Sequence, residues 1–195
     1  MEINNTFYRM PKAPMLGAWA AHVPESFRFA LKAPRRITHA KALAFEPEAV
    51  AHLFHAAEAL GDRLGPVLFQ LPPWLRRDVG RLRELLAALP PGRRAAVEFR
   101  HASWLDEEVF GALRASGAAL CGADFDEAEK RVPLIATAGF GYLRLRAADY
   151  GDDALQAWAR EIAAQPWQEV YVFFKHEDAG AAPRLAARLL ELAGL

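Results

Sequence analysis

Short runs in which apolar and polar side chains alternate recur along the chain. In residues 95–100, Val97 and Phe99 fall on one side of an extended backbone, and Glu98 and Arg100 fall on the other. A side-chain period of two indicates a β-strand with one apolar face. Such runs predict seven strands, at residues 2–8, 27–33, 66–71, 95–100, 118–123, 141–146 and 170–175.

Segments with a helical period separate most of these strands. Gly61 is expected to end the helix over residues 46–60, and the Pro-Pro-Gly run at residues 90–92 the helix over residues 78–89. Ser103 is expected to cap the fourth of these helices, and Asp152 or Asp153 the fifth. The predicted helices cover residues 15–22, 46–60, 78–89, 104–116, 152–164 and 183–192.

The order of strands and helices predicts the fold class. Strands that alternate with helices pair in parallel through right-handed crossovers. A doubly wound sheet is covered on both sides, so its strands are apolar on both faces, whereas these strands keep one polar face. We therefore expect a TIM-barrel-like (β/α) barrel. A complete eightfold barrel takes about 250 residues, and this chain has 195. The expectation is about seven parallel strands in a single domain over residues 1–195.

Composition narrows the possible environments and partners. Lys and Arg together number 24, as do Asp and Glu, so no net charge attracts a polyanion, and nucleic acid is an unlikely partner. Cys121 is the only cysteine, which excludes an intrachain disulfide and a cysteine zinc cluster. No apolar stretch approaches the ~20 residues of a membrane span, and the N-terminus lacks the apolar region of a signal peptide. We expect a cytoplasmic protein that does not bind membranes.

Four motifs resemble those of a known family. Residues 2–8 read Glu-Ile-Asn-Asn-Thr-Phe-Tyr, and the other three motifs are residues 29–34, 69–73 and 97–104. In this order they are similar to the bacterial YecE-like family, domain of unknown function number 72. The resemblance spans nearly the whole chain and implies a TIM-barrel-type fold, but no reaction is established for that family. Its members usually carry another strand and helix before the first motif, so the resemblance implies a barrel that is incomplete at the N-terminus.

The polar faces of the strands supply the candidate site. In α/β folds the chemistry lies at the carboxyl ends of the strands. The residues expected to be catalytic are Glu98, Lys32, Asp124 and Glu2. Those expected to bind substrate are Asn4, Gln70, Arg100, His101, Tyr142, Arg144 and Lys175.

The residue types of this site suggest acid–base chemistry. Glu98 could divide acid and base roles with Glu2 or Asp124 if their environments separate their pKa values. Arg100 and Arg144 suit a bidentate grip on a carboxylate or phosphate. We expect an uncharacterised barrel protein, an enzyme that acts by acid–base chemistry on a small anionic or sugar-like substrate, without cofactor or metal, as a monomer or homodimer.

Two alternatives remain open at this stage. The first is a metal-dependent phosphoester hydrolase or nuclease-like barrel, whose ligands would come from His101, 176–178, Glu98 and Asp124. The sequence has no H-x-H or H-E-x-x-H pattern to support it. The second is a non-catalytic binding protein. Whether the protein is an enzyme at all is left undecided by the sequence.

Overall fold

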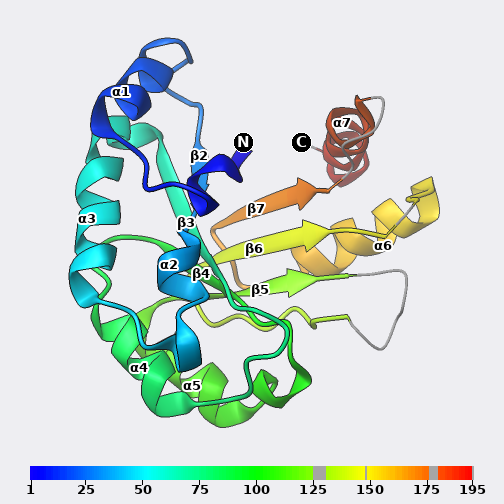
Figure 1. Ribbon diagram of the computed structural model, residues 1–195. Coiled ribbons are helices and arrows are strands. Elements are labelled where there is room, and N and C mark those ends of the chain that lie inside the picture. The colour runs from blue at the N-terminus through cyan, green and yellow to red at the C-terminus, as the bar shows by residue number, and fades with distance from the viewer. Residues whose placement is uncertain (125–130, 148, 176–179, 195) are drawn as a thin grey trace. The chain divides into compact units, whose positions relative to one another are not determined.

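Strands alternate with helices along the chain in the computed structural model, which describes residues 1–124, 131–147, 149–175 and 180–194 (Figure 1). The chain divides into two units, Met1–Ala118 and Ala119–Leu195, and each is treated by itself. The prediction of a single domain stays a prediction. In the described part of the chain, no helix has the length and apolar character needed to span a membrane.

The first unit holds four parallel strands in chain order, with helices between them. Single turns of 3₁₀ helix follow β1 and β4, at Asn5–Phe7 and Ala102–Trp104. The main elements are β1 (Glu2–Ile3), α1 (Ala13–Ala21), β2 (Phe29–Lys32), α2 (Arg35–Thr38), α3 (Pro47–Ala57), β3 (Leu64–Gln70), α4 (Val79–Ala87), β4 (Ala95–Glu98) and α5 (Glu107–Ser116).

The register of these strands places the predicted polar residues on one face. Side chains of directly opposite residues in a parallel sheet point to the same side. Gln70 is opposite Glu98, and Lys32 is opposite Leu68, two residues before Gln70. Glu2 lies opposite the residue two positions before Lys32. Glu2, Lys32, Gln70 and Glu98 therefore share a face, as their alternation predicts.

The other face of the strands packs against the helices. The rings of Phe69 in β3 and Phe54 in α3 are stacked with centroids 6.5 Å apart, and Phe29 in β2 lies 6.1 Å from Trp19 in α1. Phe54 and Phe69 are both nearly inaccessible to solvent. The expectation that the apolar face of each strand meets the helices is confirmed for this unit.

The first predicted strand is too long. The strand over residues 2–8 ends at Ile3, and Asn5–Phe7 form a 3₁₀ turn. Asn is depleted in strands because its side chain competes for local backbone hydrogen bonds. Buried Thr6 then ties this turn to β2, since its hydroxyl lies 2.7 Å from the carbonyl oxygen of Lys32 and 3.1 Å from that of Ile3.

Two predicted helix caps are also wrong. Asp106 rather than Ser103 caps α5, where its carboxylate accepts the backbone N–H of Glu108 at 3.0 Å. Ser103 belongs to the preceding 3₁₀ turn. The fifth predicted helix, α6 (Asp152–Ala163), is expected from the sequence to be capped by Asp152 or Asp153, but its N-cap is Gly151, which has no side chain to cap it.

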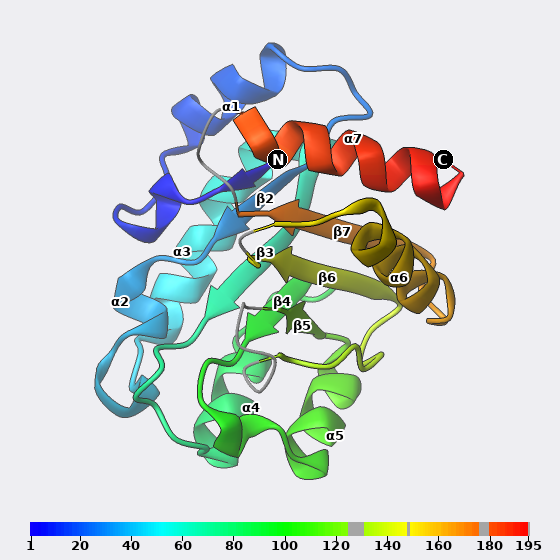
Figure 2. The ribbon, with the colours of Figure 1, turned by 90° about the vertical axis from the view of Figure 1, so that its right-hand side faces the viewer.

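The second unit holds three parallel strands and two long helices. Leu143 and Leu145 pack with Leu155, Trp158 and Leu189 in a buried core that joins the sheet to both helices. Figure 2 shows these two helices beside the last two strands. The elements are β5 (Ala119–Ala123), β6 (Phe140–Leu145), α6 (Asp152–Ala163), β7 (Glu169–Phe174) and α7 (Ala181–Ala193).

Gly141 provides a test of packing in the second unit. A Cβ atom at this position would lie 2.4 Å from the ring of Trp167, and the ring nitrogen of Trp167 is itself buried. We expect Gly141→Ala to lower the free energy of unfolding by about 1–3 kcal/mol, because a rigid ring and a strand backbone must move apart. Gly111→Ala is the control, since nothing lies within 4 Å of its added methyl group. Equal stability of the two variants in urea unfolding would contradict the prediction.

Candidate functional site

A buried carboxylate stands at the carboxyl ends of β3 and β4. Glu98 is only 1% exposed, and its Oε2 accepts a hydrogen bond of 2.8 Å from the side-chain amide of Gln70. The Nε atom of Arg100 lies 3.9 Å from the other carboxylate oxygen, and the Arg100 side chain is 39% exposed. We call these three residues the carboxylate cluster. It joins a fixed, buried carboxylate to a cation that reaches solvent.

Lys32 lies at the end of β2 on the same face of the sheet, one strand away from Gln70. Its ammonium nitrogen is 4.4 Å above the centre of the Phe7 ring. A cation over an aromatic face is held by the ring quadrupole while it keeps its charge. The turn after β1 therefore positions the cation at the end of β2, through Phe7 as well as through the Thr6 hydroxyl.

Several positively charged side chains of this region act on the pKa of His39. His39 follows α2, which lies beyond the carboxyl end of β2 (Figure 2). Burial, and then the charges of Lys32, Arg35 and Arg100, hold the pKa of His39 below its ordinary value of 6.5. These cations therefore stand near a neutral imidazole at physiological pH. Its Nδ1 is 2.9 Å from the Thr38 hydroxyl.

Four aromatic rings run along the same region, and we call them the aromatic row: Tyr8, Phe7, His39 and Trp74. Successive ring centres are 5.2, 5.0 and 5.8 Å apart, each pair in an edge-to-face arrangement. The candidate site residues chosen from the sequence did not include Phe7, Tyr8 or His39. The signal available was an aromatic pair at the end of the first predicted strand, and a basic segment ending in histidine after the second.

Two other predicted residues of the first unit lie apart from the carboxylate cluster. When the register is followed from β4 to β1, Glu2 is level with a position four residues before Glu98. The two residues are also three strands apart. Asn4 has helical dihedral angles and an exposed side chain, because the strand ends before it. Their assigned roles stay predictions.

His101 has a structural role in the loop after β4. Its Nδ1 accepts the backbone N–H of Ser103 at 3.1 Å and lies 2.9 Å from the Ser103 hydroxyl. This contact caps the 3₁₀ turn and leaves the proton of a neutral ring on Nε2. A substrate contact by His101 stays a prediction.

The second unit has its own buried carboxylate, directly after β5. Asp124 is 7% exposed and accepts hydrogen bonds from the Arg146 backbone N–H at 2.6 Å and the Tyr150 hydroxyl at 2.5 Å. The Tyr150 oxygen in turn accepts the Ala147 N–H at 2.9 Å. Burial and the contact with Asp124 raise the pKa of Tyr150 above its ordinary value of 10. Asp124 thus closes the loop after β6, and its catalytic role stays a prediction.

The remaining predicted residues lie on β6 and after β7. Tyr142 and Arg144 are buried at 0% and 3% exposure, on the face of β6 away from the helices. Tyr142 packs against Tyr171 and Phe173 of β7. Lys175 is exposed just beyond β7, with its backbone N–H bonded to Leu145.

The metal alternative stays a prediction. Residues 176–178, which supplied three of its possible ligands, lie outside the described residues. Among the residues whose structure is described, there is no group of three or more His, Cys, Asp or Glu side chains that could hold a metal ion.

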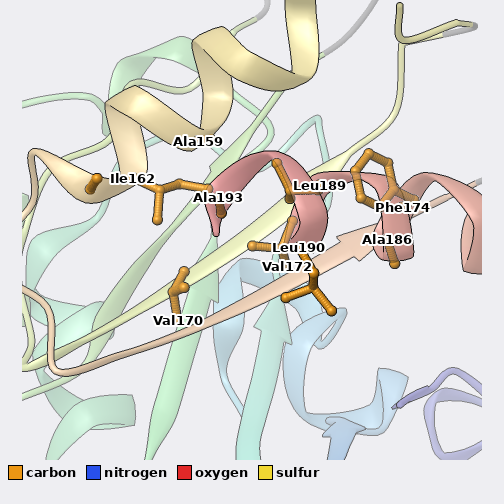
Figure 3. Close-up of a pocket in the computed structure, with 10 residues that line it drawn as sticks. Ala159, Ile162, Val170, Val172, Phe174, Ala186, Leu189, Leu190 and Ala193 are labelled. Carbon is orange, nitrogen blue, oxygen red and sulfur yellow. The ribbon is translucent and has the colours of Figure 1, made fainter. Parts of the chain in front are cut away.

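A cavity of about 490 Å³ lies in the second unit, between α6, β7 and α7 (Figure 3). Ile162, Val172, Phe174, Leu189 and Leu190 are among its lining residues, all of which are apolar. It offers no side-chain donor or acceptor to orient a polar substrate, so it is not a candidate for acid–base chemistry.

Comparison with known proteins identifies the family. The family model described as "Protein of unknown function DUF72" matches residues 1–195. The chain belongs to the DUF72 family. It is 25% identical over 221 residues to the UPF0759 protein YecE of Escherichia coli (strain K12), covering 98% of this chain and 80% of that protein. It is 24% identical over 202 residues to the UPF0759 protein YunF of Bacillus subtilis (strain 168), covering 91% and 67%.

Solved structures of other DUF72 proteins show the same fold. A DUF72 family protein from Enterococcus faecalis V583 superposes with a TM-score of 0.83 at 18% identity, over 100% of this chain and 84% of the other. One from Thermotoga maritima MSB8 gives 0.80 at 24% identity, over 100% and 84%. The predicted α/β fold of TIM-barrel type with seven parallel strands is confirmed, and so is the family resemblance.

Proposed function

We propose that this DUF72 chain binds a small anionic or sugar-like ligand at the carboxyl ends of β2–β4. The observation that supports it most is the position of Lys32, 4.4 Å above the Phe7 ring, whose centre lies 5.0 Å from His39. Arg35 and Arg100 also act on the pKa of His39. Lysine and arginine side chains at the end of a sheet can hold an anionic group through charge-assisted hydrogen bonds. The carboxyl ends of parallel strands are also where α/β folds bind their ligands.

We further propose that Glu98 is the acid–base group of this site. The carboxylate is nearly inaccessible to water, and Gln70 fixes one oxygen while Arg100 flanks the other. A carboxyl group in such a position can exchange a proton with a ligand held by the neighbouring cations. This combination favours an enzyme over a binding protein that lacks catalysis.

Titration with inorganic phosphate or sulfate tests the binding half of the proposal. We expect Arg100→Gln to weaken binding by about tenfold, equivalent to about 1.4 kcal/mol, as for loss of a charge-assisted hydrogen bond. Arg114→Gln is the matched control, because Arg114 is similarly exposed and pairs with Glu107 in α5. No binding to either anion, or equal loss in both variants, would contradict the proposal.

A screen of sugars and sugar phosphates by proton NMR tests the catalytic half. Where a substrate turns over, Glu98→Gln is expected to abolish turnover and to keep anion binding, since the amide retains the size of the carboxyl group but not its proton transfer. Turnover that persists in Glu98→Gln would rule out the acid–base role.

A further inference from the structure

The aromatic row ends in a solvent-exposed indole. Trp74 is 72% exposed, whereas the other rings of the row nearest the cations, Phe7 and His39, are half-buried. Leaving a large apolar ring in water costs free energy that burial would recover. Trp74 therefore has apolar ring area that a ligand beside the candidate site could cover.

The backbone that carries Trp74 is fixed from both sides. The N–H of Leu75 bonds to the carbonyl oxygen of Pro72 at 3.1 Å, which closes a turn. The carbonyl oxygen of Leu75 accepts the ring N–H of buried Trp104 at 2.8 Å. The Trp74 ring is thus exposed while its backbone is held by hydrogen bonds on both sides. This arrangement suits stacking with the ring of a bound ligand.

Positive charge lies one ring away from this indole. The ring centre of Trp74 is 5.8 Å from that of His39, and that of Phe7, with Lys32 4.4 Å above it, is 5.0 Å from His39. Arg35 is in the helical turn that His39 ends, where its carbonyl oxygen accepts the His39 backbone N–H at 2.8 Å, and Arg35 and Arg100 both act on the pKa of His39. A ligand that reached both features would carry a flat ring at one end and an anionic group at the other, separated by roughly the width of one further ring.

We propose that this surface binds a nucleoside phosphate, with the base on Trp74 and the phosphate among Arg35, Lys32 and Arg100. The inference rests on the proposed anion site and names its ligand class. A single nucleotide fits better than a strand of nucleic acid. The interplanar angles along the row are 84°, 75° and 78°, so neighbouring rings offer no parallel faces for successive bases.

Calorimetric titration with adenosine monophosphate, ribose phosphate, adenosine and inorganic phosphate tests the proposal. We expect adenosine monophosphate to bind tighter than ribose phosphate. Trp74→Leu should weaken the binding of adenosine monophosphate by about tenfold, the usual effect of losing one stacked base. The binding of ribose phosphate should not change. Tyr8→Leu is the matched control, because Tyr8 is 71% exposed at the opposite end of the row. It should have no effect on either ligand.

A second pair of variants tests the phosphate contact. Arg35 and Arg36 are both exposed in α2, and of the two only Arg35 acts on His39. Arg35→Gln should weaken the binding of both phosphorylated ligands several-fold. Arg36→Gln should weaken the binding of neither.

The outcomes separate this inference from the proposed function. Equal binding of adenosine monophosphate and ribose phosphate, unchanged in Trp74→Leu, overturns the base site but leaves the anion site intact. If no phosphorylated ligand binds, inorganic phosphate included, both the base site and the anion site are overturned. Glucose phosphate that binds as tightly as adenosine monophosphate and depends equally on Trp74 assigns the ring to a sugar, and an oligonucleotide that binds tighter than the mononucleotide assigns the surface to a strand. Either result overturns the proposal.

Discussion

Glu98→Ala is expected to lower the free energy of unfolding by about 2–4 kcal/mol. The substitution removes the acceptor of the buried Gln70 amide and leaves that donor without its 2.8 Å bond. It also leaves a space where a side chain with 1% exposure had been packed. The Arg100 contact adds less, because the Arg100 side chain is 39% exposed and its Nε atom is 3.9 Å from the carboxylate. Urea unfolding followed by circular dichroism measures the change.

Matched variants distinguish this burial effect from a general loss of charge. Glu98→Gln keeps the volume and one acceptor oxygen, so its cost should be smaller than that of Glu98→Ala. Glu108→Ala removes a half-exposed carboxylate paired with Arg83, and is expected to cost less than about 1 kcal/mol. Equal costs for Glu98→Ala and Glu108→Ala would show that Glu98 is not held as the contacts indicate.

Alternation along the chain was enough to find the carboxylate cluster. A strand has a strict side-chain period of two, so the faces of β3 and β4 follow from which residues are apolar. Glu98 and Gln70 fall on the same face by that rule, and the register places them opposite each other. The sequence could not show which oxygen of Glu98 meets Gln70, since that depends on side-chain rotamers.

Phe7, Tyr8 and His39 of the aromatic row were not chosen as site residues, for a physical reason. Phe7 and Tyr8 follow β1 in a 3₁₀ turn, and His39 follows a helix of one turn. Neither segment is long enough to show a periodic pattern, so nothing in the sequence fixes the direction of its side chains. The predicted strand over residues 2–8 also assigned Asn4 to a strand face, although the strand ends before that residue.

The second carboxylate shows how residue type alone can mislead. Asp124 directly follows β5 and Glu98 is the last residue of β4, so the sequence treats the two alike. In the structure Asp124 accepts two hydrogen bonds from the loop after β6. Those donors are a backbone N–H and a tyrosine 26 residues away in sequence, which no local pattern reveals.

We expect Asp124→Ala to lower the free energy of unfolding by about 3 kcal/mol, because both donors lose a charged acceptor in a buried place. Tyr150→Phe should cost about 1–3 kcal/mol, since it removes one of those hydrogen bonds and the acceptor of the Ala147 N–H. The double variant should cost less than the two single changes added together, because they share one interaction. Additive costs would show that Asp124 and Tyr150 act independently.

The raised pKa of Tyr150 adds a dependence on pH with a defined sign. In the unfolded chain a tyrosine loses its proton near pH 10, whereas the folded protein keeps the Tyr150 proton on its bond to Asp124. The unfolded state therefore binds fewer protons above that pH, and stability falls as pH rises. The stability contributed by this group is fully present below pH 10. Urea unfolding between pH 8 and 11 should show a steeper decline for the wild type than for Tyr150→Phe, and parallel declines would contradict the role given to this pair.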